Sequence, residues 1–312
     1  MIRTLIRGLK RLLLAPAGGE LARLQTMVET QLLLAAQSEV RRVRGTANPR
    51  DLREVEFRVF SQWGEDGILQ YLLGRVPVIR EIFVELGVED YRESNTRFLL
   101  KQNNWRGLVV DADRENIESI RRSDLYWRHE LTGICSFITR ANVNDLIRQA
   151  GFEGDVGLLS IDIDGNDYWV WQAIDTIRPR IVICEYNSVF GRRRAVTVPY
   201  QADFRRSRAH HSNLYFGASL PALCKLAETK GYVFAGSNSA GCNAFFVLEE
   251  FSGGIRSHSA DEGYVSSLAR ESRDRRGHLT YASGADRLAL IRNMPVYDID
   301  RDMTIPLSEA VE

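Results

Sequence analysis

The sequence predicts an α/β protein whose core is a doubly wound, mostly parallel sheet, and three observations support that prediction. Four units in which an apolar strand is followed by a helix occur between residues 82 and 187, the order of elements typical of parallel α/β sheets. The clearest strand, residues 156–164, is apolar on both faces, as expected when helices cover both sides of a parallel sheet. Polar residues gather at the ends of these strands, where open α/β sheets bind their ligands.

The composition is that of a globular chain without a charge bias. Its 312 residues can form one large α/β domain with extensions or two small domains. The 41 basic and 41 acidic residues balance, so we expect no nucleic-acid partner. The four cysteines show no metal-finger spacing, which favours reduced thiols and a cytoplasmic location. No apolar run reaches the roughly 18 residues that a membrane span needs.

Residues 1–50 are expected to form an N-terminal helical segment. Pro16 and the glycine pair that follows it predict a break before a second helix at 20–44. The segment 1–14 lacks the clean apolar stretch of a signal peptide. It could make a peripheral contact with an anionic membrane surface, or pack on its own protein or on a second subunit as part of a homo-oligomer. Its basic residues lie opposite an apolar stripe made of Ile2, Leu5, Leu9 and Leu12.

Residues 51–251 contain the predicted α/β domain. Its strands are expected at 82–88, 107–113, 132–139, 156–164 and 180–187, and its helices at 68–73, 93–102, 116–122, 143–150 and 168–177. Ser94 or Asn95 stands where it could cap the helix at 93–102.

The last part of the domain contains a long loop and a hairpin. Residues 188–217 are polar and rich in arginine, and a loop of this length is usually functional or mobile. A helix at 220–230 follows, and then two strands, 232–237 and 243–248, joined by a turn. Residues 252–312 are expected to form a C-terminal extension.

The first strand, its turn and the next strand have the pattern of a nucleoside site. Glu85 and Gly87 stand at the turn after the first strand, and Asp111 ends the second. In such sites the backbone of the turn approaches the ligand, and the acid accepts hydrogen bonds from ribose hydroxyls. Asp113 is the alternative acid. The hairpin that completes the domain is typical of class I S-adenosylmethionine-dependent methyltransferases, whose final strand is antiparallel.

Several segments of the sequence are similar to those of FkbM-type and related methyltransferases. They are Phe-Val-Glu-Leu-Gly-Val at 83–88, Asn95-Thr96, Trp-Arg-Gly-Leu-Val-Val-Asp at 105–111, Leu-Ser-Ile-Asp-Ile-Asp-Gly-Asn-Asp-Tyr-Trp at 159–169 and Pro-Arg-Ile-Val-Ile-Cys-Glu-Tyr-Asn at 179–187. The resemblance covers about residues 57–250. It implies a Rossmann-like sheet, S-adenosylmethionine as cofactor and methylation of a hydroxyl on a sugar, glycan or natural-product-like acceptor. The cofactor site is then expected to include Glu85, Gly87, Asn95, Asp111, Asp113 and Asp162.

Acids at the ends of two neighbouring strands predict a metal site. Asp162, Asp164, Glu185 and Asn187 are expected to converge, because alternate residues of a strand share a face. Such oxygen ligands suit Mg²⁺, which could lower the pKa of an acceptor hydroxyl. This arrangement resembles the metal-assisted O-methyltransferases. The alternative is that Asp162 and Asp167 bond backbone amides or cap the next helix.

Other residues could act on the acceptor directly. Without a metal, the predicted general base is Asp164, His210 or His211, since histidine titrates near neutral pH. The arginines of the long loop could bind a phosphorylated or acidic acceptor, or could simply be solvated. They are Arg192, Arg193, Arg194, Arg205, Arg206 and Arg208.

Two other functions remain open. Asp162-x-Asp164 is also the pattern by which some glycosyltransferases hold a metal and a nucleotide sugar, although the turn at Gly87 and Asp111 would then have no role. A non-catalytic, methyltransferase-like binding or assembly protein is the third possibility, because Glu89 and Tyr91 stand where many methyltransferases have further glycines.

Overall fold

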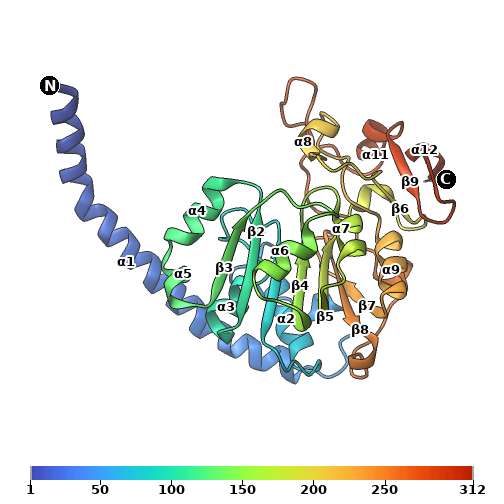
Figure 1. Cartoon of the computed structure of the whole chain (residues 1–312), viewed down its shortest axis with the longest axis horizontal. Coiled ribbons are helices and arrows are strands. Elements are labelled where there is room, and N and C mark those ends of the chain that lie inside the picture. The colour runs from blue at the N-terminus through green and yellow to red at the C-terminus, as the bar shows by residue number, and fades with distance from the viewer. Residues whose placement is uncertain (1, 311–312) are drawn as a thin grey trace.

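The computed structural model describes residues 2–310, and a seven-stranded sheet forms its centre (Figure 1). Its strands are β1 (Ile82–Leu86), β2 (Arg106–Asp111), β3 (Leu131–Cys135), β4 (Gly154–Ile161), β5 (Ile177–Glu185), β7 (Tyr232–Ser237) and β8 (Asn243–Leu248). They are ordered β3-β2-β1-β4-β5-β8-β7. β8 runs antiparallel to both of its neighbours, whereas the pairs among β1 to β5 are parallel. The predicted mostly parallel sheet with an antiparallel last strand is confirmed.

Helices cover both faces of this sheet. One face carries α2 (Glu65–Leu73), α3 (Arg97–Asn103), α4 (Arg114–Arg122) and α5 (Asp124–Arg128), and the other carries α6 (Val143–Gln149), α7 (Asp167–Ala173) and α9 (Leu220–Thr229). The side chains of each strand alternate between the two faces. In β2, for example, Val109 packs with the first group of helices, and Leu108 and Val110 pack with the second. The sheet is therefore doubly wound, as the apolar strands predict.

All five of the predicted parallel strands end earlier than expected. β1 ends at Leu86, β2 at Asp111, β3 at Cys135, β4 at Ile161 and β5 at Glu185. The cause is clearest after β1 and β4, where Gly87 (φ 81°) and Asp164 (φ 54°) adopt the left-handed backbone conformation, which a strand cannot continue through. The acids after β4 therefore lie in a turn beyond the strand, and not on its alternating faces.

The N-terminal segment is one continuous helix, so the predicted break at Pro16 is wrong. α1 spans Ile2–Gly45 and extends away from the rest of the molecule at its N-terminal end (Figure 1). It is anchored in its second half, where Glu29 binds Arg97 and Lys101 at 2.9 and 2.6 Å. Helical structure propagates easily from such an anchored part, even though a proline removes one backbone donor.

α1 packs on the domain through Ala36 and Val43 but leaves other apolar side chains exposed. Its exposed apolar side chains include Leu24, Met27, Val28, Leu32 and Leu34. The side chains of residues 1–14, for which membrane contact is predicted, lie outside those that the structure describes. No helix in residues 2–310 is both long enough and apolar enough to cross a membrane. The membrane contact and the homo-oligomer stay predictions.

The long loop and the C-terminal extension fold together into what we call the cap (residues 188–217 and 264–310). Within it, β6 (Val196–Thr197) pairs with β9 (Pro295–Asp298), and β9 pairs with β10 (Met303–Pro306). Phe204 and Leu214 of the loop share a buried apolar cluster with Ile291 and Ile305 of the extension. Its short helices are α8 (Arg206–Ala209), α11 (Ala285–Ile291) and α12 (Leu307–Ala310), and the last two lie near β9 in Figure 1.

The remaining elements connect these parts. They are the 3₁₀ helices η1 (Leu52–Val55), η2 (Ser188–Phe190) and η3 (Glu249–Phe251), and α10 (Ala260–Gly263). Of the four cysteines, Cys184 and Cys224 are buried, Cys242 is half-buried and Cys135 is exposed, and all four are free.

Candidate active site

A cavity of about 480 Å³ lies at the carboxyl ends of the parallel strands. The turns that follow β1, β2, β3 and β4 line it, together with the end of β5 and part of the cap. This is the position at which open α/β sheets bind ligands. Eight of its lining residues are acids and one is basic, which makes it a strongly acidic site. The acids are Glu85, Glu89, Glu93, Asp111, Asp162, Asp164, Glu185 and Glu271, and the base is Arg206.

Glu85 organises the turn that leads into α3. Its carboxylate accepts hydrogen bonds from the Ser94 hydroxyl (2.6 Å), the Asn95 amide (2.9 Å), and the amide and hydroxyl of Thr96. Burial raises the pKa of Glu85, and these hydrogen bonds oppose the rise. Ser94 and Asn95 therefore do not cap α3 as predicted, because Thr96 holds the cap position.

Gly87 is required by the packing of β1 against β4. A Cβ atom there would lie 1.7 Å from the backbone oxygen of Asp162. The backbone φ angle of 81° also favours glycine. The chain runs this close because the Asp162 amide donates to the carbonyl of Leu86 at 2.9 Å. The glycine thus permits contact between two turns of the protein itself.

Asp111 stabilises the same turn from β2. One of its oxygens accepts from the amides of Val88 (3.2 Å) and Glu89 (2.8 Å). The other accepts from the Asp113 amide (2.7 Å) and the Asn116 side chain (3.3 Å). A carboxylate has about four acceptor positions, so each of them is in use.

Asp113, the predicted alternative to Asp111, does not belong to the site. Its side chain caps α4 by accepting from the Glu115 amide at 2.7 Å. It is exposed and lies outside the cavity lining. A residue two positions past the strand end is well placed to start the next helix, and Asp113 does so.

Asp162, Asp164 and Glu185 form an acid cluster in the cavity. One oxygen of each lies within 4.8 Å of the others. The Asp162 side chain is open to the cavity, although protein surrounds its carboxyl on the other sides. Burial and repulsion from Asp164 and Asp167 raise the pKa of Asp162 well above its usual range. Burial and repulsion from Asp162 and Asp164 do the same to the pKa of Glu185. The structure thus brings together three of the four predicted metal ligands.

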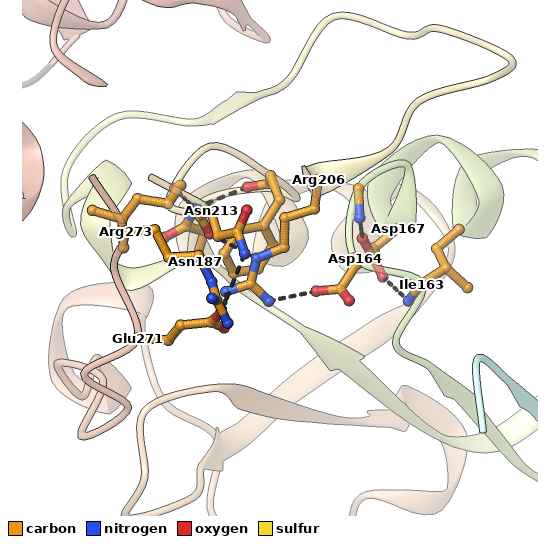
Figure 2. Close-up of polar contacts among 11 residues, drawn as sticks. Ile163, Asp164, Asp167, Asn187, Arg206, Asn213, Glu271 and Arg273 are labelled. Carbon is orange, nitrogen blue, oxygen red and sulfur yellow. Dashed lines mark hydrogen bonds and ion pairs between the residues drawn. The ribbon is translucent and has the colours of Figure 1, made fainter. Parts of the chain in front are cut away.

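Asp167 has the structural role that was the alternative to metal binding. Its oxygens accept from the amides of Ile163 (2.8 Å) and Gly165 (2.9 Å), as Figure 2 shows. Burial raises the pKa of Asp167 to about 6, against the effect of these hydrogen bonds. The carboxylate fixes the turn that presents Asp162 and Asp164.

Asn187, the fourth predicted ligand, is not part of the cluster. Its side-chain amide donates to the carbonyls of Leu214 and Phe216, both at 2.9 Å, and its oxygen accepts from the Val189 amide at 3.0 Å. It is 2% exposed. These bonds hold the cap loop against the end of β5, so the prediction of Asn187 as a ligand is corrected.

His210 and His211, predicted as possible bases, lie outside the cavity. Their rings stack at a centroid distance of 4.1 Å, and Nδ1 of His210 lies 2.8 Å from the Ser212 hydroxyl. Burial and the neighbouring His211 and Arg275 lower the pKa of His210. Among the predicted bases, only Asp164 lines the cavity.

Arg206 is the residue from the cap that reaches the acid cluster. Its guanidinium binds Asp164 at 2.6 Å and lies 3.6 Å from Glu271 (Figure 2). It also lies over the Phe216 ring at 4.0 Å. Of the six loop arginines, only Arg206 lines the cavity, whereas Arg192 pairs with Asp261 and Arg205 lies over Phe137 at the edge of the lining. The sequence marks the arginines as a group but does not indicate which one enters the site.

Two buried asparagines belong to the cavity lining. Oδ1 of Asn166 and Oδ1 of Asn243 have no hydrogen-bond partner among residues 2–310, and both residues line the cavity. They are 3% and 6% exposed. The sequence analysis gave neither of them a role in the site, because Asn166 stands among acids in the segment 159–169 and Asn243 begins a predicted strand.

No protein-family model and no curated protein matches the sequence. Solved structures resemble it at low identity. An O-methyltransferase from Bacillus cereus, solved with SAH, is 14% identical over 36% of this chain and 52% of its own, with a TM-score of 0.27, so the match spans about half of that protein. The N-terminal domain of EvdMO1 with SAH bound is 9% identical over 72% of this chain and 96% of its own, with a TM-score of 0.38. The pyocyanin biosynthetic protein PhzM is 10% identical over 58% and 56%, with a TM-score of 0.32.

Proposed function

We propose that this chain is an S-adenosylmethionine-dependent O-methyltransferase that acts on a hydroxyl of a sugar, glycan or natural-product-like acceptor. The observation that carries the proposal is the acid-lined cavity at the carboxyl ends of a parallel sheet whose last strand is antiparallel. A final antiparallel strand is typical of class I methyltransferases, which the segments at 83–88 and 159–169 also resemble.

The charge of the cavity fits this cofactor. S-adenosylmethionine has a sulfonium, an ammonium and a carboxylate, so it is a net cation. Eight acids and one arginine line the cavity, and this balance favours a cationic ligand over an anionic one. A nucleotide sugar carries a negatively charged diphosphate and would need metal ions to offset the same acids. The volume of about 480 Å³ is in the range of small-molecule sites.

The turns after β1, β2 and β3 would hold the nucleoside part. Asp111 is the expected acceptor for ribose hydroxyls, and binding there would replace its longest hydrogen bonds, those from Val88 (3.2 Å) and Asn116 (3.3 Å). Phe137 and Ile138 give this side of the cavity an apolar surface. Glu85 acts by holding the turn that shapes the site.

The acid cluster would act on the acceptor. The bound cofactor supplies a methyl group on a positively charged sulfur. Asp162, Asp164 and Glu185 have the oxygen ligands that Mg²⁺ prefers, and an ion held there would polarise the acceptor hydroxyl. Without a metal, Asp164 or Asp162 would accept the proton of the hydroxyl, since both are open to the cavity and only Asp164 is paired with Arg206.

Calorimetric titration with S-adenosylhomocysteine, with and without Mg²⁺, tests the proposal. We expect binding that weakens at least about tenfold in Asp111→Asn, which loses a charge-assisted acceptor. Asp113→Asn is the matched control, because asparagine also caps helices and position 113 lies outside the cavity. If neither S-adenosylhomocysteine nor S-adenosylmethionine binds, with or without Mg²⁺, the proposal is contradicted. Binding of a nucleotide sugar instead would favour a glycosyltransferase, and binding of neither class would favour a non-catalytic protein.

A further inference from the structure

The acid cluster has more negative charge than its surroundings offset. Asp162, Asp164 and Glu185 contribute three carboxyl groups within 4.8 Å of one another. The cation bound to the cluster is Arg206, which contacts Asp164 at its edge. One oxygen of Glu185, Oε2, has no hydrogen-bond partner among residues 2–310. A cluster of this kind needs a further cation or protons to be stable.

Asn243 lies beside this cluster on the next strand. β5 and β8 are antiparallel neighbours, and Asn243 is the register partner of Glu185. Both residues line the cavity, and Asn243 is 6% exposed. A buried amide next to a carboxyl group is therefore part of the cavity wall.

The orientation of the Asn243 amide is fixed from behind by Glu65, at the start of α2. Oε1 of Glu65 accepts from Nδ2 of Asn243 at 2.9 Å and from Nδ2 of Asn238 at 2.7 Å. The other oxygen of Glu65 accepts from the amides of Trp63 and Gly64. An ionised carboxylate only accepts hydrogen bonds, so the atom of Asn243 that faces it must be the NH₂ group.

It follows that the carbonyl oxygen of Asn243 points away from Glu65. This atom, Oδ1, has no hydrogen-bond partner within the described part of the chain. Burying a carbonyl oxygen without a hydrogen-bond partner costs free energy of folding. Native structures usually do so only where a ligand, an ion or a water molecule contacts that oxygen. Carbonyl and carboxylate oxygens together are the ligand set of Mg²⁺ and Ca²⁺.

We propose that Asn243 is a ligand of a divalent cation held by Asp162, Asp164 and Glu185, and that Glu65 is the positioning residue that aims it. The inference deepens the proposed function and rests on its cation site. It assigns to Asn243 the place that sequence reasoning gave to Asn187. The ion would join the ends of β4, β5 and β8 and satisfy the unpartnered oxygens of Glu185 and Asn243.

Binding of Mn²⁺ to the full chain without cofactor tests this inference. Free Mn²⁺ is measured by electron paramagnetic resonance, and Mg²⁺ is then used as a competitor. Asn243→Ala should weaken Mn²⁺ binding at least about tenfold, and Glu65→Gln should weaken it by about the same factor although it does not touch the ion. Asn166→Ala is the matched control, because it removes another unpartnered buried carbonyl from the same cavity.

A second measurement separates a lost ligand from a loosened fold. When Asn243 is replaced by alanine, a water should take its position on the ion, so the water-proton relaxation per bound Mn²⁺ should rise. Thermal unfolding without metal shows whether each variant is folded, and Asn243→Ser offers a milder change if alanine is not tolerated. Wild-type Mn²⁺ affinity in folded Asn243→Ala, equal weakening by Asn166→Ala, or unchanged relaxation would overturn the inference.

The outcome is independent of methyl transfer. If the chain binds S-adenosylhomocysteine but Asn243→Ala leaves Mn²⁺ binding unchanged, this inference fails and the proposed function stands. If Mn²⁺ binding depends on Asn243 but neither S-adenosylmethionine nor S-adenosylhomocysteine binds, the metal site stands and the proposed function fails.

Discussion

At the scale of single residues, the chemistry of the cavity depends on which oxygens already have partners. Asp111 uses each of its acceptor positions, and Asp167 is bonded to the turn that it stabilises. Glu185 and Asn243 each keep one oxygen without a partner among residues 2–310. Acids with the same appearance in sequence therefore differ in what a ligand must displace. A ligand at Asp111 has to replace existing hydrogen bonds, whereas the unpartnered oxygen of Glu185 can accept a new contact without such an exchange.

Arg206 is expected to compete with a bound cation. Its guanidinium contacts Asp164 at 2.6 Å, so a metal ion must share that carboxylate with it. Replacing Arg206 with methionine keeps an apolar side chain over Phe216 but removes the positive charge. We expect Mn²⁺ to bind about tenfold more tightly in this variant, equivalent to about 1.4 kcal/mol. Arg208→Met, a change at an exposed arginine of the same helix, should have no effect. Weaker binding in Arg206→Met would contradict this interpretation.

Asp66 is expected to make stability depend on pH. It is fully buried, and one of its oxygens accepts from the amides of Val59, Phe60 and Ser61. Burial raises its pKa from 3.8 to about 6, against the effect of those hydrogen bonds. The folded state therefore keeps a proton that the unfolded chain releases. The stabilisation from this group is complete below about pH 4 and is lost as the pH rises through about 6.

Comparison with Asp66→Asn isolates this contribution, because other acids titrate in the same range. Between about pH 4 and about pH 7 the wild type should lose up to about 3 kcal/mol of unfolding free energy relative to the variant. Urea unfolding at a series of pH values measures the difference. A difference that does not change with pH would show that Asp66 is ionised throughout.

At the scale of helices and strands, local pattern predicted the elements that form the sheet. β7 and β8 begin and end at the predicted residues, because a turn separates two short apolar runs. Strand ends at the site were less predictable, since left-handed residues such as Asp164 end a strand without a sequence signal. The break predicted at Pro16 failed because the helix is anchored farther along, which local propensity does not include.

Glu29 is expected to be the main polar anchor of α1. It binds Arg97 and Lys101, whose side chains are only 14% and 13% exposed. Both cations also lie near the Phe60 ring. Glu29→Gln leaves them partly buried without a negative partner, which should cost about 1–2 kcal/mol of unfolding free energy.

The control for this prediction is another ion pair on the same helix. Glu39 binds Arg42 at 2.7 Å, but both side chains are largely exposed. Glu39→Gln should therefore change stability by less than about 0.5 kcal/mol in the same denaturant experiment. Equal effects of the two substitutions would mean that Glu29 does not anchor the helix.

At the scale of the whole molecule, the candidate site combines parts that are distant in sequence. The sheet contributes Asp111, Asp162 and Glu185, and the cap contributes Arg206 and Glu271. The cap could not be predicted, because it depends on pairing between a two-residue strand, β6, and the distant β9. The proposed role of Asn243 as a cation ligand could not be predicted from the sequence for the same reason. It depends on contact with Glu65 and on the register of β8 with β5.

The cap is expected to loosen without unfolding the sheet. Ile305 of β10 is 3% exposed and packs in the apolar cluster that joins the two segments of the cap. Ile305→Ala should remove about 2–4 kcal/mol of stability from the cap, because it leaves a cavity in that cluster. We expect faster proteolysis within residues 199–213, while S-adenosylhomocysteine binding at the turns after β1 and β2 changes little.

Leu268→Ala, which alters an exposed side chain of the cap, should leave the proteolysis rate unchanged. If Ile305→Ala instead lowers the denaturation midpoint of the whole chain in one transition, the cap and the sheet unfold as one unit, and the cavity is shaped by both together.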